Sequence, residues 1–490
     1  MKKQTPNMDT AFLGHPKGLS TLFFTEMWER FSYYGMRAIL LLYMYYAINQ
    51  GGLGLDRGLS MSIMSIYGAL VYVSSVVGGY ISDRILGSRR TVFYGGILIM
   101  FGHIALALPL GLTALFTSIV LITLGTGLLK PNVSDMVGDL YGPSDTRRDA
   151  GFTIFTFGIN LGALIAPIVV GWLGQNVNFH LGFSLAAIGM FFGLFQYVVE
   201  GKKTLSQHGM KPGNPIQSNE LRGIITKVIL GIIALAVIIF IMSLNHALNI
   251  ANIITLITII TLLLTVVYFV IMLTSKKVDS VERSHVWAYI PLFIASAIFW
   301  AIEEQGSSIL AMFAATQTQN HVLGLTIPAS FYQTLNPLFI LIYSPIFAWL
   351  WGKLGKRQPG SPVKFSMGMV IAGLSYVFMV IPVVMFGTKS LVSPLWLVGS
   401  WAIIEIAEML ISPVGLSVTT KLAPKAFSSE MMSMWFLSDA VGQAISSQIV
   451  GSYSQNEAMY FGIIGLLAIV AGLILVMFVK PLKKLMQGIR

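Results

Sequence analysis

Residues 26–37 read EMWERFSYYGMR and lie within an apolar run that predicts a membrane-crossing helix over residues 19–48. The polar positions of this stretch follow the spacing of one helical face and carry Glu26, Glu29, Arg30, Tyr33 and Arg37. An ionisable group at the bilayer centre costs about 2.5–3.5 kcal/mol on insertion scales. Four such groups on one face therefore need partners, water or a function. Self-neutralisation is the structural alternative, because Glu26 precedes Arg30 by four residues, the favourable order for a helical ion pair.

The composition is that of a multi-span membrane protein. The chain has 490 residues, of which 55% are hydrophobic and 10% charged, whereas a soluble domain carries about 25% charged residues. It contains no cysteine, which excludes a disulfide framework and thiolate chemistry. The polar start, residues 1–18, lacks the pattern of a cleavable signal, so we expect the run from Leu19 onward to stay in the membrane.

Fourteen apolar runs are long enough to cross a bilayer as helices, at about 20 residues each. They fall near 19–48, 60–82, 91–110, 112–138, 150–173, 181–199, 222–245, 250–273, 287–315, 330–351, 363–386, 394–420, 430–452 and 458–480. We therefore expect an all-α membrane protein with 14 transmembrane helices. It would consist of two six-helix bundles, residues 1–200 and 287–490, joined by connectors and two inserted helices in residues 201–286. The inserted helices carry almost no charge, so we expect them to be peripheral and lipid-facing.

The distribution of Lys and Arg predicts the orientation. If the N-terminus is cytoplasmic, most basic residues fall in cytoplasmic segments, and only Arg57 and Lys389 fall in outer loops. This asymmetry is the positive-inside rule, and it predicts that both termini are cytoplasmic. The net charge of +11 would then face anionic lipid headgroups rather than nucleic acid.

The segment 79–90, GYISDRILGSRR, predicts a tight turn between the second and third helices, where glycine is needed. We expect Asp83 to cap a helix or to pair across the bundle, and an ordinary basic loop is the alternative.

Further ionisable groups lie inside predicted spans. Lys130 is deep in the fourth helix and needs a carboxylate partner, although snorkelling toward the cytoplasmic side is an alternative. Glu303 and Glu304 are adjacent, so on a helix they point about 100° apart and cannot share one partner. One of them should face a cavity.

The spans hold more acid than base. Before any aspartate is counted, six glutamates (26, 29, 303, 304, 405 and 408) stand against three cations (Arg30, Arg37 and Lys130). Uncompensated carboxylates in a low-dielectric site tend to hold protons. If these groups share one cavity, it is a proton-binding device. Glu26 and Glu29 are candidate proton carriers, with Arg30 and Lys130 as cationic partners, and one of Glu303 and Glu304 is a third.

The stretch ExxERFxYYG at residues 26–35 resembles the first-helix signature of the proton-dependent oligopeptide transporters, a branch of the major facilitator superfamily. Residues 79–90 resemble the major facilitator loop motif with one extra residue, a likeness that makes Asp83 and Arg84 candidate gating residues. Residues 152–163, FTIFTFGINLGA, are similar to the family's FTIFYMGINLGA element but depart from it at Thr156-Phe157. ExxxSPxGLS at residues 408–417 resembles its tenth-helix pattern, and the 6+2+6 plan resembles its prokaryotic members.

The resemblance implies a major facilitator fold and proton-coupled import of di- and tripeptides by alternating access. A peptide's carboxylate would meet Arg37 and Lys130, and its amino group would meet Glu408. The family's Glu-Gln pair falls on Glu304 and Gln305, which makes Glu304 the expected partner of Lys130. Glu405 is left between a structural and a functional role.

The resemblance also places further side chains around the ligand. Asn160 would contact the peptide backbone, with an interhelical hydrogen bond as the alternative. The others are Tyr33, Tyr34, Tyr72, Trp300, Asn336 and Trp435.

Other classes of function find little support. The seven histidines show no metal spacing, and we expect His103, inside a span, to have a satisfied packing role rather than a proton-relay role. We see no nucleophile–base pair and expect no enzyme activity, metal or cofactor. The alternatives are a major facilitator transporter of another solute, such as nitrate or a sugar, and a membrane sensor that binds peptide without moving it. We expect a monomer in a bacterial inner membrane.

Overall fold

The computed structural model describes residues 9–142, 145, 147–205, 208–322 and 324–489. Residues 1–8 of the tail expected in the cytoplasm, and the last residue, Arg490, lie outside this range. The membrane-crossing helices are α1 (Lys17–Tyr45), α2 (Arg57–Ile81), α3 (Ser88–Ala107), α4 (Leu112–Gly138), α5 (Arg148–Asn176), α6 (Phe179–Thr204), α7 (Ser218–Leu244), α8 (Ile250–Thr274), α9 (Ser280–Glu303) with α10 (Ile309–Thr316), α11 (Leu335–Leu354), α12 (Ser361–Phe386), α13 (Leu395–Leu422), α14 (Ser428–Ile449) and α15 (Glu457–Leu485). The fourteen predicted crossings are confirmed, with α9 and α10 forming one of them.

Two crossings differ from the rest in composition. Twelve contain an 18-residue stretch of high mean hydropathy with at most two charged residues, and the two that do not are α1 and α14. Both carry polar side chains into the interior of the protein. These two helices are therefore the first places to look for a site.

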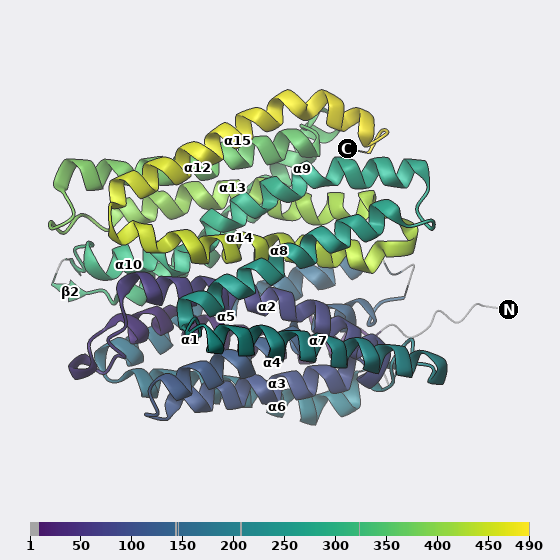
Figure 1. The fold of residues 1–490 in the computed structure, drawn as a ribbon, viewed down its shortest axis with the longest axis horizontal. Coiled ribbons are helices and arrows are strands. Elements are labelled where there is room, and N and C mark those ends of the chain that lie inside the picture. Colours follow the sequence, from purple (N-terminus) through teal and green to yellow (C-terminus); the bar gives the residue numbers. More distant parts are fainter. Residues whose placement is uncertain (1–8, 143–144, 146, 206–207, 323, 490) are drawn as a thin grey trace.

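The helices form two bundles with two helices added at the side. Figure 1 shows α1–α6, in purple and blue, as one bundle and α9–α15, in green and yellow, as the other. Both termini lie at one end of the molecule, which we call the terminal end. The opposite end, which carries the loops 46–56, 317–328 and 387–394, is called the distal end. A two-strand hairpin, β1 (His321–Val322) with β2 (Leu325–Thr326), lies there.

In each bundle, one pair of helices packs closely through a glycine on each helix. A Cβ atom on Gly125 would lie 2.6 Å from the carbonyl oxygen of Gly95, and one on Gly373 would lie 2.4 Å from that of Gly465. No side chain fits between these backbones. Because lipid offers no hydrophobic force between helices, close approach at small residues stabilises such pairs.

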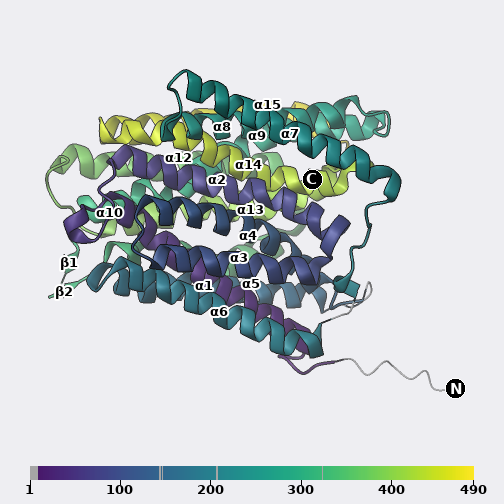
Figure 2. The same ribbon diagram turned by 60° about the horizontal axis from the view of Figure 1, so that its bottom comes forward.

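The inserted helices are unlike one another. Figures 1 and 2 show both at the periphery, and none of the described residues of α7 is buried. Peripheral placement is thus confirmed for α7. The helix α8 instead packs on α14, where the Thr258 hydroxyl donates to Ala444 O at 3.2 Å and lies 3.4 Å from the Ser447 hydroxyl. A buried threonine stripe on α8 makes this contact, and the prediction of a purely lipid-facing helix was wrong for it.

One predicted helix is interrupted. The run 287–315 was predicted as one crossing, and within it α9 ends at Glu303 and a 3₁₀ turn, η4 (Glu304–Ser307), separates it from α10. The Trp401 ring fills the space beside Gly306, where a Cβ would lie 2.2 Å from it. The carbonyl of Gly306 accepts a hydrogen bond from Gln333 Nε2 at 2.8 Å. Side-chain donors of this kind replace broken helical bonds, which is how interrupted helices survive in membranes.

Candidate functional site

The predicted polar face of α1 is buried inside the protein. Arg30 Nε lies 3.2 Å from Glu26 Oε1 and also bonds Glu29 Oε2. All three side chains are at most 4% exposed, and Glu26 Oε2 and Glu29 Oε1 have no hydrogen-bond partner among the described residues. The guanidinium also lies 5.2 Å from the centre of the Tyr33 ring. One guanidinium therefore serves two carboxylates, so self-neutralisation is incomplete.

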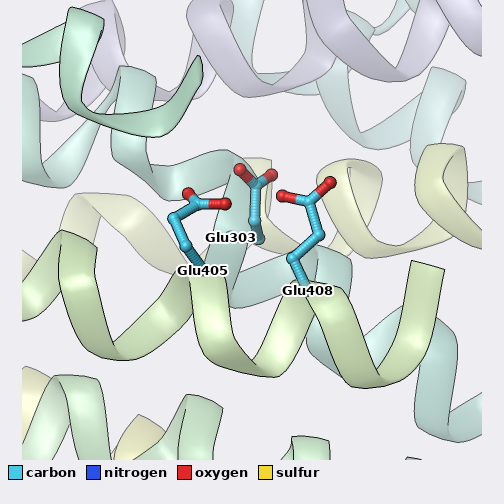
Figure 3. A group of neighbouring side chains, drawn as sticks. All are labelled: Glu303, Glu405 and Glu408. Carbon is cyan, nitrogen blue, oxygen red and sulfur yellow. The ribbon is translucent and has the colours of Figure 1, made fainter. Parts of the chain in front are cut away.

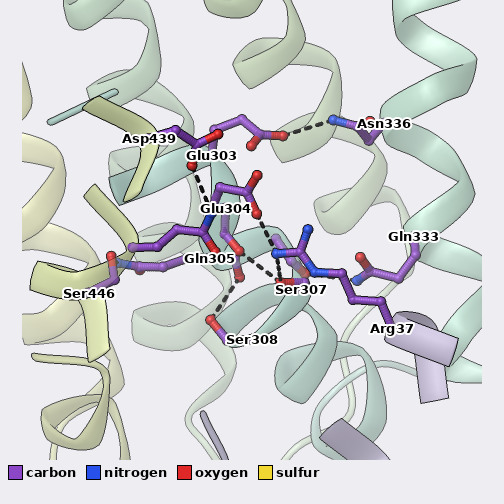
Figure 4. A network of polar contacts seen from close by, with 12 residues as sticks. Arg37, Glu303, Glu304, Gln305, Ser307, Ser308, Gln333, Asn336, Asp439 and Ser446 are labelled. Carbon is purple, nitrogen blue, oxygen red and sulfur yellow. Dashed lines mark hydrogen bonds and ion pairs between the residues drawn. The ribbon is translucent and has the colours of Figure 1, made fainter. Parts of the chain in front are cut away.

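The second arginine of this face crosses to the other bundle. Arg37 Nη2 pairs with Glu304 Oε2 in η4 and donates to the Ser307 hydroxyl at 2.9 Å (Figure 4). The Arg37 and Glu304 side chains are only 10% and 9% exposed. This buried pair ties α1 to the broken crossing.

The expected pairing of Lys130 with Glu304 is not the one in the structure. Glu304 is taken by Arg37, and Lys130 Nζ lies 4.2 Å from the centre of the Tyr72 ring. No described carboxylate lies within 4.0 Å of Lys130. The physical reason is reach: the turn at η4 directs Glu304 toward α1 and not toward α4.

Three carboxylates gather in the other bundle. Glu303 on α9 and Glu405 and Glu408 on α13 have oxygen atoms within 4.8 Å of one another (Figure 3). Asn336 on α11 donates to Glu303 Oε1 and to Glu405 Oε1, each at 2.8 Å. Like charges at this separation repel one another strongly in a buried site. Glu405, which the sequence left undecided, belongs to this cluster.

A small cavity lies between the Arg37–Glu304 pair and the carboxylate cluster. It has a volume of about 50 Å³ and is lined by Tyr34, Arg37, Glu303, Glu304, Asn336 and Trp401, among others. Glu303 and Glu304 do have separate partners, as predicted. Both nevertheless line this cavity, because the helix ends between them.

The remaining predicted ligand contacts lie nearby. The rings of Trp300 and Trp435 meet edge to face at 6.4 Å, and a Cβ on Gly415, in the segment that resembles the tenth-helix pattern, would lie 2.1 Å from the Trp435 ring. That glycine therefore seats Trp435. Asn160 donates to Thr156 O of its own helix at 3.0 Å, so the alternative of an interhelical bond is not what the structure shows.

The predicted gating segment contacts the connector after α6. Arg84 pairs with Glu220, and the backbone oxygens of Asp83 and Arg84 accept bonds from Asn214 N at 3.0 Å and Ile216 N at 3.2 Å. Asp83 forms no ion pair with any described residue, so the expected pairing across the bundle is absent here. The turn itself, η2 (Ser82–Leu86), is a π-helical continuation of α2.

Sequence reasoning missed three polar features. Asp439 is buried in the middle of α14, and it was passed over because the run 430–452 was counted only as a span. Gln305 is fully buried and bonds Ser446. Arg57 pairs with Glu457 at 2.9 Å, and Gln317 also bonds Glu457, at the distal end. An acid inside a span was the signal that could have found Asp439.

His103 does not have the satisfied role that was expected. It is fully buried, and neither ring nitrogen has a hydrogen-bond partner among the described residues.

Comparison with known proteins identifies the family. A sequence model described as "POT family" matches residues 89–466. The chain belongs to the POT family. It is 54% identical over 480 residues to the transporter YclF of Bacillus subtilis, covering 98% of this chain and 96% of that protein. It is 51% identical over 490 residues to a di-/tripeptide transporter of Lactococcus lactis subsp. cremoris, covering 98% and 99%.

A solved structure of the POT family agrees over nearly the whole chain. The crystal structure of a peptide transporter POT in complex with sulfate matches with a TM-score of 0.95 and 54% identity, over 98% of each chain. The resemblance inferred from residues 26–35 and the major facilitator fold are thereby confirmed. The protein is a multi-span membrane transporter with bacterial relatives.

Proposed function

We propose that this POT-family protein is a proton-coupled symporter that imports di- and tripeptides by alternating access. The observation that most supports this proposal is the division of charge between the two bundles. One bundle supplies the cations Arg37 and Lys130, and the other supplies Glu303, Glu405 and Glu408 in a single cluster. The names of the Lactococcus relative and of the solved structure support the substrate class.

A short peptide has the charges that such a site can bind. Its carboxylate would bind Arg37 and Lys130, and its amino group would bind Glu408. Charge-assisted hydrogen bonds of this kind are strong in a dry cavity. Asn160 and Asn336 would form hydrogen bonds with the peptide backbone. The side chains of the peptide would lie among Tyr33, Tyr34, Tyr72, Trp300 and Trp435.

The site must open before it can bind. A volume of about 50 Å³ holds a few water molecules but no dipeptide. The distal end is closed by contacts between the bundles: Arg37 with Glu304, Arg57 with Glu457, and Gln175 Oε1 with Ser330 N at 2.9 Å. This arrangement suits a transporter whose distal side is shut, with residues 1–200 and 287–490 as the two rocking units.

Protons supply the driving force. A zwitterionic peptide has no net charge, whereas a proton gains about 2.3 kcal/mol per 100 mV of membrane potential. Protonation of Glu304 would remove its charge and release Arg37 for the peptide carboxylate. Glu26 and Glu29, which share Arg30, are further proton carriers, and Lys130 is the second receptor for the peptide carboxylate. The pair that opens is thus Arg37–Glu304, and no step needs a metal or cofactor.

The membrane orientation we propose follows the distribution of Lys and Arg. Both termini would be cytoplasmic in a bacterial plasma membrane, with the distal end outside, and the bundles would work within one monomer. Asp83 and Arg84 would act as a gating element at the cytoplasmic end, through the connector that they contact.

Uptake into proteoliposomes tests the proposal. With an inside-alkaline pH gradient, labelled dialanine should accumulate, and a protonophore should prevent it. Unlabelled dipeptides should compete and free amino acids should not, because they lack the peptide unit. Glu29→Gln or Lys130→Ala should abolish gradient-driven accumulation. Accumulation unchanged in both variants would contradict the coupling roles, and binding without counterflow would identify a sensor instead.

A further inference from the structure

Asp439 is an acid that the proposed function has not used. It lies in the middle of α14 and is 3% exposed. Its carboxylate accepts a hydrogen bond from Gln443 Nε2, one turn further along the helix, at 2.7 Å. A charged carboxylate at this depth is costly unless it has a cation or a proton. The neutral amide of Gln443 supplies neither a cation nor a proton.

The cation to compare with Asp439 is Lys130 on α4 of the opposite bundle. No described ion pair includes Lys130, whose ammonium faces the Tyr72 ring on α2. Tyr72 lies between the two groups. Its ring faces the Lys130 ammonium at 4.2 Å. Because Gly58 faces Gly451 and Gly68 faces Gln443, α2 and α14 run in opposite directions, and Tyr72, one turn after Gly68, lies at the level of Asp439, one turn before Gln443. Lys130, Tyr72 and Asp439 therefore form one chain of contacts from α4 through α2 to α14.

The backbone holds α2 and α14 close together beside this chain of contacts. A Cβ on Gly68 of α2 would lie 1.6 Å from Gln443 Oε1. Gln443 thus fills the space above Gly68 while it bonds Asp439. The position of the acid relative to Tyr72 is fixed as long as the bundles stay in contact here.

The titratable groups that face Asp439 from other elements of its bundle are acids, Glu304 in η4 and Glu303 on α9. Figure 4 shows Asp439 beside Glu303 and Glu304, at the far side from Arg37. Arg37 neutralises Glu304 in this state.

We propose that Asp439 is a further proton-coupling residue, the counter-ion of Lys130 in the empty transporter and a proton acceptor when peptide binds. The proposal rests on the proposed function. When a peptide carboxylate reaches Lys130, two carboxylates compete for one ammonium. A proton from water then binds a carboxylate oxygen of Asp439, the charge of the site stays balanced, and α14 is released from α2. The proton leaves when the peptide does.

Two transport modes in proteoliposomes separate coupling from structure. Asp439→Asn imitates the protonated acid in size and should cut gradient-driven dialanine accumulation about tenfold or more, since the driven proton is lost. Counterflow exchange of labelled dialanine, which needs no net proton movement, should remain. Its pH dependence should flatten relative to the parent protein. Asp439→Glu keeps the ionisable group and should restore driven accumulation in part.

Gln443→Met is the matched control. It removes the hydrogen bond to Asp439 but leaves the acid, so driven accumulation should persist if the acid acts through its proton. Equal loss of accumulation in Gln443→Met and Asp439→Asn would show a structural role and overturn the proposal. So would driven accumulation at the parent level in Asp439→Asn. If Asp439→Asn does not fold, the pH profile of Asp439→Glu decides, because an unshifted profile contradicts the proposal. If the parent itself fails to accumulate dialanine, the proposed function fails and not the assignment of Asp439 alone.

Discussion

Arg37 carries one positive charge but has two possible carboxylate partners, Glu304 and the carboxylate of a bound peptide. In this structure its guanidinium holds Glu304 and Ser307 across the two bundles, and a peptide carboxylate would have to replace that contact. The exchange is possible because both candidates are carboxylates bound by the same donors. Arg30 is likewise shared, because its guanidinium contacts both Glu26 and Glu29. Two acids thus face one base at Arg30, and a bound peptide would create the same excess at Arg37.

Glu304→Gln tests whether the buried pair holds the bundles together. The amide keeps the shape but leaves Arg37 buried without a counter-charge, and losing one partner of such a pair costs about 3–5 kcal/mol. We expect a clearly lower melting temperature in detergent by scanning fluorimetry.

Glu220→Gln is the control for Glu304→Gln, because it breaks an ion pair in which Glu220 is 43% exposed. Exposed pairs contribute about 0–1 kcal/mol, so its melting temperature should stay near that of the parent. Equal melting temperatures for both variants would show that the Arg37–Glu304 pair contributes little.

At the scale of elements, α1 is placed by glycines on α5. A Cβ on Gly162 would lie 2.3 Å from the carbonyl oxygen of Met27, and this oxygen belongs to the backbone that carries Glu26, Glu29 and Arg30. The glycine segment of α5 therefore sets how deep the charged face of α1 sits. The break at η4 plays the equivalent part in the other bundle, because it aims Glu304 at Arg37.

Gly162→Ala should push α1 away from α5. Because backbone atoms cannot move aside as side chains do, we expect a loss of about 1–3 kcal/mol, as for other overpacked sites, together with weaker peptide uptake. Gly231→Ala in α7 is the matched control. Nothing lies within 4 Å of a Cβ there, so it should leave stability equal or raise it by up to about 1 kcal/mol. A Gly162→Ala protein as stable as the Gly231→Ala protein would contradict the packing argument.

The sequence predicted the positions of the helices better than it predicted the contacts between them. Apolar length located the fourteen crossings, and helical spacing grouped Glu26, Glu29 and Arg30 correctly, because these patterns are local. The end of α9 could not be predicted, since it depends on Trp401 and Gln333 from distant segments. The partner of Glu304 was missed for that reason. Asp439 was visible as an acid inside a span, but its relation to Lys130 depends on the packing of α2 on α14.

At the scale of the whole molecule, the two bundles meet through polar contacts at the distal end. Arg57 on α2 reaches Glu457 on α15, and its guanidinium also lies 4.7 Å from the centre of the Tyr453 ring. Gln175 on α5 meets Ser330 in η5 (Ala329–Thr334). These contacts are spread over different helices of each bundle, so opening the distal side must break them together.

Crosslinking tests this requirement. The chain has no cysteine, so Gln175→Cys with Ser330→Cys introduces the sole thiols, one on each bundle. Treatment with a short bifunctional thiol reagent should abolish dialanine uptake, and reduction should restore it. Each single variant, treated in the same way, should keep its uptake. Uptake that continues after complete crosslinking would mean that the distal contacts need not part.

The small volume of the cavity beside Arg37 and Glu304 limits how much water can solvate the charged side chains around it. About 50 Å³ leaves room for roughly four water molecules by the usual volume per site. The charged groups around it have therefore lost most of their solvent shell during folding, before any cargo arrives. An incoming peptide has to shed its own water, but it finds receptors that are already largely dry and held in place.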